Sequence, residues 1–408
     1  MFERTEVSRL VIGSGRDELL CLDVSLPQDA LAAHQGKAQF VYMDPPFLTG
    51  DTFALRRPFG TTGWEKGKPM VQTGGFSDRA SDPEAYYAML KGLITTARGL
   101  LRPEGLFALH LDWRASARAR LLCEEIFGPN QFLNELIWSY ESGGRAKRWF
   151  SRKHDTILLF AADAGRYRFS LDKVPIPRTE ARHNHLKRRV DENGRAYGAI
   201  TVGGKEYRYY DDEPTYPGDV WTDISHLQQR DPERTGWPTQ KPLRLMERLM
   251  LPTVTTRDLA VELCCGSGSC LAAARALGCH FVGCDLAPEA ISVSVHRLQK
   301  DLSVTCPQTA DQAALYGGVH GGMMLLTGLD APHPAWPRGC SGLDAIESWA
   351  CGRLTPDGVL RAFELLRRTR STPDIQPMSL LPPGPGVPAV WCFDAAGRAM
   401  AFRWTGEE

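Results

Sequence analysis

The segment "VYMDPPFLTG", residues 41–50, ends an apolar run on a carboxylate, continues with two prolines and then presents an aromatic ring. Asp44 offers an acceptor oxygen and Pro45 a carbonyl that no helix uses, and the prolines Pro45 and Pro46 restrict the backbone that holds both acceptors. Phe47 adds a flat face on which a planar ring can stack. This combination suits the exocyclic amine of adenine or cytosine, whose nitrogen must shed a proton when it acts as a nucleophile. The alternative interpretation is a proline-rich turn without chemistry.

A second candidate site lies in "VELCCGSGSC" and the following "VGCDLAP", which predict a strand, a glycine turn, a helix, a strand and then an acid. Gly266 and Gly268 allow a ligand to approach the backbone and the helix N-terminus. Asp285 follows Gly266 by 19 residues, a spacing at which a carboxylate can bond ribose hydroxyls. The third glycine of a dinucleotide fingerprint is missing, which favours a nucleoside with a small polar group over a pyrophosphate. A tight strand–helix turn without a ligand is the alternative.

The elements that must position these sites alternate between strands and helices, which predicts an α/β fold with a parallel sheet. A long loop, functional or mobile, is expected over residues 48–75. Ser81 is expected to cap a helix over 81–101, and Gly128 to close another over 114–128. Gly203-Gly204 indicates a hairpin. Further strands are expected over 9–14, 38–43, 104–113, 131–140, 152–161 and 205–210, a helix over 239–253, and a helical patch followed by a hairpin over 357–370 and 389–404.

Charge is distributed unevenly along a chain whose 408 residues have a formal net charge of zero. Residues 140–189 contain 13 Lys or Arg against 5 Asp or Glu, whereas residues from 301 onward contain 8 against 11. A basic segment with interspersed aromatics predicts a polyanionic partner. The 11 cysteines include no CxxC pair, so neither a disulfide frame nor a metal site is expected. With no signal sequence and no apolar run of about 20 residues, a cytoplasmic protein without membrane contact is expected.

Together, "DPPF", the glycine motif at 262–268 and "TQKP" at 239–242 resemble the S-adenosylmethionine-dependent amino-methyltransferases of DNA. The resemblance covers roughly residues 8–300, and the catalytic tetrapeptide precedes the cofactor motif, the permuted order of the beta group. It implies a circularly permuted class I methyltransferase fold, with a Rossmann-like, doubly wound, mostly parallel sheet. The implied domains are a catalytic domain of residues 1–140 and 236–300, an inserted target-recognition region of residues 141–235, and a small α+β C-terminal extension of residues 301–408 whose role is unknown.

Roles follow from the resemblance by position. Asp44 and the Pro45 carbonyl would hold the target amine, with Pro46 fixing the turn and Phe47 stacking on the base. The sequence departs from the family pattern in two places: Glu262 replaces an aspartate, and Leu263-Cys264 replaces Pro-Phe. The alternatives are weaker cofactor binding or a compensating aromatic elsewhere in the chain. His110 and Asp112 are either cofactor contacts or satisfied strand-end groups. The cofactor-binding residues implied are Thr239 (otherwise only a helix cap), Lys241 (facing a carboxylate), Glu262, Cys264, Gly266, Ser267, Gly268, Ser269 (bonding the cofactor carboxylate) and Asp285.

Double-stranded DNA is the expected partner, with the target base flipped out of the helix. Adenine N6 is favoured over cytosine N4, because an aspartate opens the tetrapeptide. A homodimer and a separate restriction endonuclease remain open. The other function classes considered are a catalytically inactive DNA-binding protein and a dinucleotide-dependent oxidoreductase, which would leave "DPPF" unexplained. The DNA contacts expected in the basic segment are Arg145, Lys147, Arg148, Arg152 and Lys153.

Overall fold

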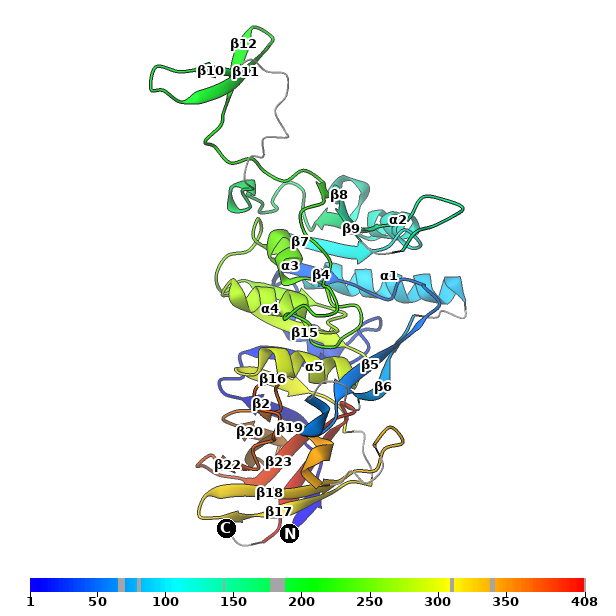
Figure 1. Ribbon diagram of the computed structural model, residues 1–408, viewed down its shortest axis with the longest axis vertical. Helices are drawn as coiled ribbons and strands as arrows, with labels where there is room; N and C mark the ends of the chain where they lie inside the picture. Colours follow the sequence, from blue (N-terminus) through cyan, green and yellow to red (C-terminus); the bar gives the residue numbers. More distant parts are fainter. Residues whose placement is uncertain are drawn as a thin grey trace.

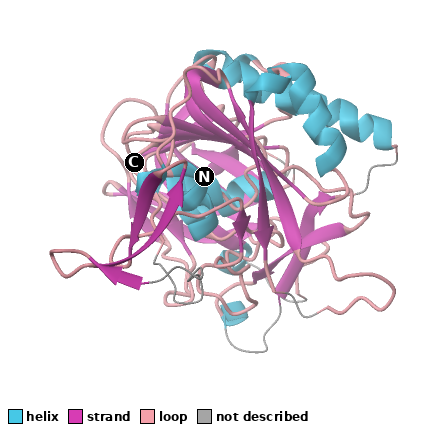
Figure 2. Cartoon of the chain, turned by 90° about the horizontal axis from the view of Figure 1, so that it is seen from above, coloured by secondary structure: helices cyan, strands magenta, loops and turns pink. Residues whose placement is uncertain are grey.

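The computed structural model describes residues 1–64, 70–78, 82–141, 144–176, 188–308, 312–337 and 342–406. Its main feature is a 16-stranded sheet with the order β1-β24-β23-β19-β20-β2-β16-β3-β15-β14-β4-β7-β9-β8-β13, in which β21 pairs with β19 (Figures 1 and 2). Six neighbouring strands at its centre run parallel, as expected. These strands are β16 (Leu302–Thr305), β3 (Asp17–Cys21), β15 (His280–Asp285), β14 (Leu259–Glu262), β4 (Ala38–Met43) and β7 (Leu101–Leu111).

Helices cover both faces of this parallel centre. Alternate residues of β4 point to opposite sides, so that Phe40 and Tyr42 belong to one hydrophobic core and Val41 and Met43 to the other. The first core also contains residues of α3, α4 and α5, and the second those of α1 and α2, which makes the sheet doubly wound. Among the helices in the described ranges, none is long and apolar enough to cross a membrane. The helices are α1 (Pro83–Leu100), α2 (Ser116–Phe127), α3 (Leu243–Met250), α4 (Ser269–Ala276) and α5 (Pro288–Leu298).

The ends of the first two helices test two sequence predictions. Gly128, with a φ of +98°, follows the last residue of α2, as predicted. The cap of α1 is Asp82, whose side chain accepts a hydrogen bond from the backbone N–H of Glu84 at 3.0 Å. Ser81, the predicted cap, lies outside the described residues.

The centre of the sheet contains a topological switch point between β14 and β4. From β14 the chain passes through α4 to β15 on one side, and from β4 through α1 to β7 on the other. A crevice therefore opens at the carboxyl ends of these two strands, where ligands bind in sheets of this kind. The residues after β4 and after β14 are those of the two candidate sites, Asp44 and the glycine turn.

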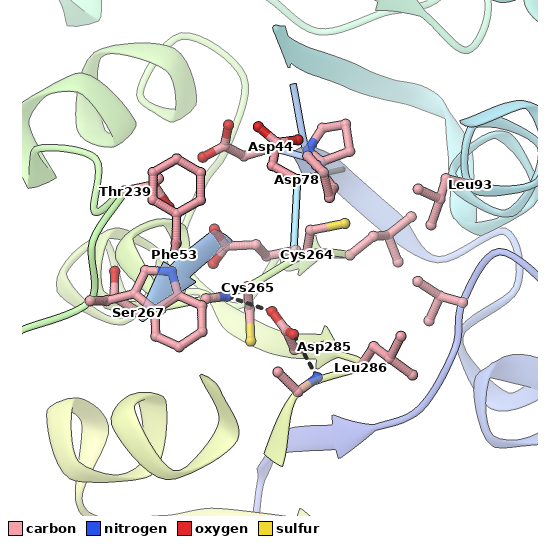
Figure 3. A pocket seen from close by; sticks show the side chains of 18 of the residues that line it. Asp44, Phe53, Asp78, Leu93, Thr239, Cys264, Cys265, Ser267, Asp285 and Leu286 are labelled. Carbon is pink, nitrogen blue, oxygen red and sulfur yellow. Dashed lines mark hydrogen bonds between the residues drawn. The ribbon is translucent and has the colours of Figure 1, made fainter. Parts of the chain in front are cut away.

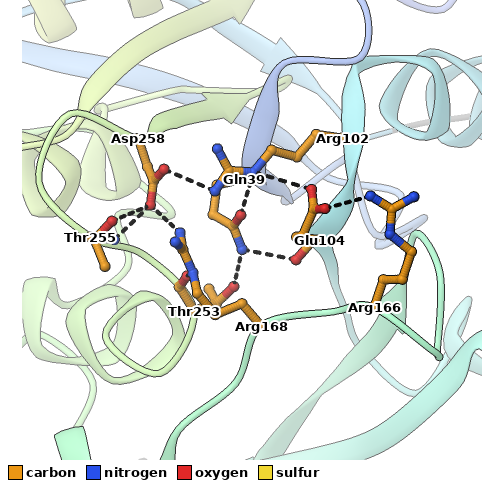
Figure 4. A network of polar contacts seen from close by, with 8 residues as sticks. All are labelled: Gln39, Arg102, Glu104, Arg166, Arg168, Thr253, Thr255 and Asp258. Atoms are coloured by element: carbon orange, nitrogen blue, oxygen red, sulfur yellow. Dashed lines mark hydrogen bonds and ion pairs between the residues drawn. The ribbon is translucent and has the colours of Figure 1, made fainter.

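The opposite edge of the sheet is fastened by a polar network (Figure 4). Gln39, buried at the start of β4, donates to the Glu104 carbonyl at 3.0 Å and to the Thr253 hydroxyl at 2.7 Å, and accepts from Arg102 at 2.6 Å. Arg102 also pairs with Asp258 at 3.0 Å. These contacts tie together the amino ends of β4, β7 and β14, so structural anchoring and the candidate sites lie at opposite edges.

The segment between β7 and α3 begins within the sheet and then leaves it. Strands β8 (Phe132–Ser139) and β9 (His154–Ala161) are antiparallel to each other, and β13 (Val220–Trp221) is parallel to β8. Between β9 and β13, a separate antiparallel sheet projects from the body at the top of Figure 1. We call this sheet the arm; it consists of β10 (Arg188–Val190), β11 (Ala196–Val202) and β12 (Lys205–Tyr210). The predicted hairpin is present, because Gly203 and Gly204, both at positive φ, connect β11 to β12.

The long loop predicted over residues 48–75 is instead largely a β-hairpin. Strands β5 (Thr52–Pro58) and β6 (Met70–Ser77) pair in an antiparallel register from Thr52 opposite Ser77 to Pro58 opposite Met70. The prediction was wrong because the abundance of Gly and Pro residues concealed two strands whose pairing partners are each other. Strand β6 packs beside α5, and Phe59 and Val71 are buried with Ala395, which follows β23.

The C-terminal extension continues the sheet, and the N-terminal strands β1 (Phe2–Arg4) and β2 (Arg9–Ile12) lie within it. The predicted hairpin over 389–404 is confirmed by β23 and β24. The predicted helix over 357–370 is wrong, because that segment forms β20, paired with β2 and β19, and β21. In the described part of residues 301–408 the structure is β with 3-10 turns, which corrects the expected α+β composition. The strands of the extension beyond β16 are β17 (Ala314–His320), β18 (Met323–Asp330), β19 (Ile346–Leu354), β20 (Val359–Ala362), β21 (Leu366–Arg367), β22 (Met378–Leu380), β23 (Val387–Asp394) and β24 (Ala399–Trp404).

A buried charged group lies where the extension meets α5. Glu347, on β19, is 6% exposed, and its Oε2 has no hydrogen-bond partner among the described residues. Burial raises the pKa of this carboxyl to about 7, although Arg57, Arg368 and Arg367 nearby oppose the shift. The carboxyl therefore holds its proton in conditions where an exposed glutamate is ionised.

Candidate functional site

A cavity of about 610 Å³ opens at the carboxyl ends of β3, β15, β14 and β4 (Figure 3). Both candidate sites face it, although they lie more than 200 residues apart in the chain. The volume is within the range of roughly 300–1,000 Å³ that is typical of small-molecule sites. Of the predicted catalytic and cofactor residues, those that line it are Asp44, Pro45, Pro46, Phe47, Thr239, Lys241, Glu262, Cys264, Gly266, Ser267, Ser269 and Asp285.

Asp44 lies directly after β4, and its Oδ2 accepts a 2.5 Å hydrogen bond from the Nζ of Lys241. The same Nζ lies 5.0 Å from the centre of the Phe47 ring. Within the described residues, the carbonyl oxygen of Pro45 has no donor, so it remains an available acceptor. The sequence placed Lys241 opposite a ligand carboxylate, whereas here its partner is the carboxylate of Asp44.

A chain of buried polar groups supports the loop from behind. Tyr42 hydrogen-bonds to the Nδ1 of His110 at 2.8 Å, and the Nε2 of His110 lies 3.0 Å from Asp155. Tyr140 donates to the other oxygen of Asp155 at 2.9 Å. Burial raises the pKa of Asp155, but the hydrogen bond and charge of His110 outweigh burial and hold it below its usual value. His110 stacks on Phe47 and does not line the cavity, which agrees with its interpretation as a satisfied strand-end group.

Two residues that the sequence did not single out fix the backbone on either side of Phe47. The carboxylate of Asp78, from the end of the β5–β6 hairpin, accepts from the N–H of Leu48 at 2.8 Å and of Thr49 at 3.0 Å. Leu48 has a φ of +60°, a strained conformation that these bonds stabilise. Tyr86, on α1, donates to the carbonyl of Pro46 at 2.7 Å. The tetrapeptide is therefore held on both sides.

The glycine turn has the conformation that its sequence predicts. Gly266 has a φ of +46°, and a side chain there would place its Cβ 2.7 Å from the Nε1 of Trp237. Its N–H donates to the Oδ2 of Asp285 at 2.8 Å, while the N–H of Ala287 donates to Oδ1 at 2.9 Å. Burial raises the pKa of Asp285, and these two donors oppose the shift. Asp285 is thereby fixed at the cavity wall, with lone pairs left for further donors.

The serines beyond this turn are bound within the protein. The hydroxyl of Ser269 donates to the carbonyl of Lys241 at 2.7 Å and accepts from Arg297 at 3.0 Å. Arg297 also contacts the carbonyl of Ser267 at 3.2 Å and pairs with Glu233 at 3.0 Å. Since the Ser269 proton already has an acceptor, its hydroxyl supports the loop that carries Lys241. Gly268, at the N-cap of α4, is not among the residues that line the cavity.

Glu262 lies at the cavity between the two sites. Its side chain is only 3% exposed, and its Oε2 has no partner among the described residues. Burial raises the pKa of this carboxyl well above its usual value, and the charge of Asp44 adds to the shift. An unsatisfied polar atom at a cavity wall indicates a place where a ligand can supply the missing donor.

Thr239 also lines the cavity, but it does not cap the helix. Helix α3 begins at Leu243, and its N-cap is Pro242. The alternative reading of Thr239 as a helix cap is therefore wrong.

The predicted DNA-contacting residues lie in an exposed loop between β8 and β9, residues 144–153, which we call the basic loop. The guanidinium of Arg152 lies 3.6 Å from the ring centre of Trp113 and 5.5 Å from that of Trp149. Phe150 is 97% exposed. Because Trp113 follows the carboxyl end of β7, next to β4, this stack places the loop at the same edge of the sheet as the cavity.

The arm and the residues that flank it, 188–213, carry cations too, but the four arginines among them are paired with carboxylates of the same segment. Arg189 and Arg208 both contact Glu206, at 2.9 and 2.8 Å. Arg195 pairs with Asp212 at 2.8 Å and with Glu213 at 3.0 Å. Arg188 forms an ion pair with Asp211.

Sequence reasoning missed several residues at the cavity. Asp78, Phe53 and Trp237 line it; Phe53 comes from the segment predicted as a loop, and Asp78 lies just beyond that segment. Trp237 lies in "GWPTQKP", next to the motif that was recognised, and an aromatic at that place was a usable signal. The others had no sequence pattern that linked them to the site.

Comparison with known proteins agrees with this geometry. A sequence model described as DNA methylase matches residues 38–296. The Type II methyltransferase M.BglII of Bacillus subtilis is 29% identical over 161 residues, which are 40% of each chain. DNA adenine methyltransferase YhdJ of Escherichia coli K12 is 27% identical over 183 residues, 44% of this chain and 55% of that protein. The match thus spans about half of these relatives or less. Among solved structures, PvuII DNA methyltransferase (cytosine-N4-specific) is 12% identical with a TM-score of 0.45, over 72% of this chain and 88% of that one.

Proposed function

The chain belongs to the DNA methylase family, the N6-adenine and N4-cytosine amino-methyltransferases, and on that premise we propose that it methylates an exocyclic amine of a base in DNA. The observation that carries the proposal is the shared cavity: Asp44 to Phe47 and the glycine turn at Gly266 line the same space. Methyl transfer requires the amine and the methyl donor in one pocket. The target we propose is adenine N6, because an aspartate opens the tetrapeptide and because the relative from Escherichia coli is a DNA adenine methyltransferase; cytosine N4 is the alternative.

The glycine end of the cavity fits S-adenosylmethionine. The left-handed turn at Gly266 leaves a cradle that a side chain would fill, and the unsatisfied Oε2 of Glu262 offers an acceptor beside it. Asp285 would accept from the ribose hydroxyls, and Glu262, Ser267 and Thr239 would face the polar remainder. When bound, this cofactor supplies a methyl group on a sulfonium sulfur.

The residues of the other end bind and prepare the amine. Asp44 and the carbonyl of Pro45 accept hydrogen bonds from its two N–H groups, which favours the pyramidal nitrogen whose lone pair forms the new N–C bond. Lys241 holds the carboxylate of Asp44 in place through their 2.5 Å contact. Phe47, supported by His110, provides the stacking face for the base. The proton that leaves the nitrogen after transfer passes to Asp44 or to water.

DNA would be held at the basic loop. Arg145, Lys147, Arg148, Arg152 and Lys153 lie on one exposed segment beside the cavity edge, where they can contact phosphates while a flipped base occupies the pocket. The stack of Trp113, Arg152 and Trp149 offers aromatic surface at the same place. A separate restriction endonuclease as partner belongs to the same proposal, since the relatives include Type II methyltransferases.

The test is to incubate DNA with the protein and S-adenosylmethionine, digest the DNA and identify the modified nucleoside by mass spectrometry. We expect N6-methyladenine. Asp44→Ala should lower kcat on the order of a thousandfold or more, because it removes an acceptor that acts on the developing charge. Asp44→Asn, which keeps the shape and a partner for Lys241, should also be strongly impaired while its thermal unfolding stays near that of the wild type.

The matched control is Asp51→Ala, an exposed carboxylate seven residues further along the same segment, which should leave kcat unchanged. If the modified nucleoside is N4-methylcytosine, the target is cytosine N4 and not adenine N6. DNA binding without any methylated nucleoside would overturn the proposal in favour of an inactive DNA-binding protein.

A further inference from the structure

The two ends of the β5–β6 hairpin meet beside the cavity. Thr52, the first residue of β5, pairs with Ser77, the last residue of β6. This pairing brings Asp78 next to Asp51, and the N–H of Asp78 donates to the Asp51 carbonyl at 2.9 Å. The hairpin therefore returns an acidic residue to the segment that follows Phe47, although 30 residues separate Asp78 from that segment.

The carboxylate of Asp78 accepts three hydrogen bonds from this segment. Oδ1 accepts from the N–H of Leu48 at 2.8 Å, and Oδ2 accepts from the N–H and the hydroxyl of Thr49 at 3.0 and 2.5 Å. Asp78 is only 3% exposed, so water does not compete for these bonds. Charge-assisted bonds in such a place are strong, and they fix the two donors of the backbone.

These bonds act on a residue whose conformation is unfavourable by itself. Leu48 has a φ of +60°, in the left-handed region that a branched side chain rarely adopts. Without the acceptor, we expect Leu48 to return to a negative φ, which rotates the chain before it relative to the chain after it. Met43 is fixed in β4 and Thr52 in β5, so the residues between them must absorb the rotation. Phe47 is the direct neighbour of Leu48.

The ring of Phe47 is the proposed stacking face for the target base. It lies parallel to His110, with 6.0 Å between the ring centres, and 5.0 Å from the Nζ of Lys241. A shift of this ring would move the base relative to the acceptors that prepare its amine, and a misplacement of about 1 Å can cost on the order of a hundredfold in rate. The three bonds of the Asp78 carboxylate do not involve the glycine turn, so the cofactor end of the cavity should keep its shape.

We propose that Asp78 is a positioning residue for methyl transfer, which holds Leu48 in its left-handed conformation and thereby fixes Phe47 beside the target base. Asp78 acts through the loop and not by contact with the reacting atoms. The inference rests on the proposed function, since it requires a base stacked on Phe47. It gives the β5–β6 hairpin, which the sequence did not predict, the role of maintaining the wall that binds the base.

The experiment measures kcat and KM on genomic DNA from a methylation-deficient bacterial strain, together with the Kd of S-adenosylhomocysteine by calorimetry. Asp78→Asn keeps the shape but replaces one acceptor oxygen by a donor that faces N–H groups. It should lower kcat/KM for DNA roughly 10- to 100-fold. The Kd should stay within about twofold of the wild type, because the cofactor end is unchanged. Asp51→Asn, the same change in an exposed carboxylate of the same turn, is the matched control and should alter neither quantity.

A second variant separates positioning from a general loss of structure. Glycine adopts a φ of +60° without a steric penalty, so Leu48→Gly added to Asp78→Asn should raise kcat/KM again, by about three- to tenfold. A merely structural role predicts the opposite result. Leu48 packs against the hydrophobic core that contains residues of α1, so its removal would destabilise an already weakened protein further.

An unchanged kcat/KM in Asp78→Asn would overturn the inference. A Kd for S-adenosylhomocysteine that rises in step with the loss of kcat/KM would overturn it too, since Asp78 would then support the whole cavity. A further fall in the double variant would reduce Asp78 to a structural role. If the wild type methylates no nucleoside of the genomic DNA, the proposed function fails together with this inference, an outcome distinct from the other three.

Discussion

The basic loop and the arm both lie between β8 and α3, and they carry the same number of cations. Residues 144–153 contain five Lys or Arg and no acid, whereas residues 188–213 contain five Lys or Arg and six Asp or Glu. In the arm, Arg188, Arg189, Arg195 and Arg208 each pair with a carboxylate. In the loop, Arg145, Lys147 and Arg148 have no ion pair within the described residues.

The difference shows that a count of basic residues does not locate the positive field of a protein. Paired charges largely cancel beyond a few ångströms, while unpaired ones act over about 10 Å at moderate salt. The basic loop is also beside the cavity edge, whereas the arm projects away from the body (Figure 1). We therefore expect the phosphate contacts of the proposed function in the loop, whereas the arm exposes two tyrosines, Tyr207 and Tyr209.

The largest effect that would sharpen this comparison comes from removing loop charge. The triple variant Arg145→Ala, Lys147→Ala, Arg148→Ala should raise the Kd for duplex DNA on the order of 30- to 100-fold at low salt, because it removes three expected phosphate contacts. Each lost contact should also lower the salt slope by about one. Fluorescence anisotropy over a salt series measures both quantities. Cofactor affinity should be unaffected, and a triple variant with an unchanged salt slope would show that the loop does not contact phosphates.

A smaller effect is expected from the stack that orders the loop. Trp113→Ala removes the ring beneath Arg152 and should raise the Kd for DNA about two- to fivefold, the size of an exposed cation–π contact. Phe363→Ala, an exposed aromatic on the extension, is the control and should change nothing. Equal effects in the two variants would deny the stack any role in DNA binding.

The smallest effect tests the arm. The charge-neutral double variant Arg195→Gln, Asp212→Asn deletes a surface ion pair, whose contribution to stability is small. Its Kd for DNA should stay within about twofold of the wild type, because the pair contributes little net field. A rise in this Kd as large as that of the loop variant would contradict the expected difference between loop and arm. It would mean that Arg195 exchanges its acidic partners for DNA.

The parallel core and the convergence of the two candidate sites could be predicted from the sequence. The apolar run that ends at Met43 and the glycine turn at Gly266 are local signals, and a parallel sheet necessarily brings strand ends to one edge. The shared cavity of Asp44 and Gly266 follows from that topology.

What could not be predicted depends on partners distant in sequence. Residues 357–370 contain helix formers, yet Val359 and Leu360 are in β20 because β2 and β19 offer unpaired backbone groups to pair with. Lys241 faces Asp44 across 197 residues, and no pattern in either segment indicates the pair. The hairpin of β5 and β6 was hidden for a different reason, since abundant Gly and Pro residues concealed two strands that pair with each other.

The stability of the junction between the extension and α5 depends on whether the buried carboxyl of Glu347 is protonated. Its pKa is raised from an ordinary 4.5 to about 7, so the folded chain keeps a proton that the unfolded chain releases in that interval. The free energy of unfolding should consequently fall as pH rises from about 4.5 to 7, by on the order of 3 kcal/mol from this group, and Glu347→Gln should lack this part of the fall. Mild acid would thus tighten the junction against α5, and an alkaline shift would loosen it.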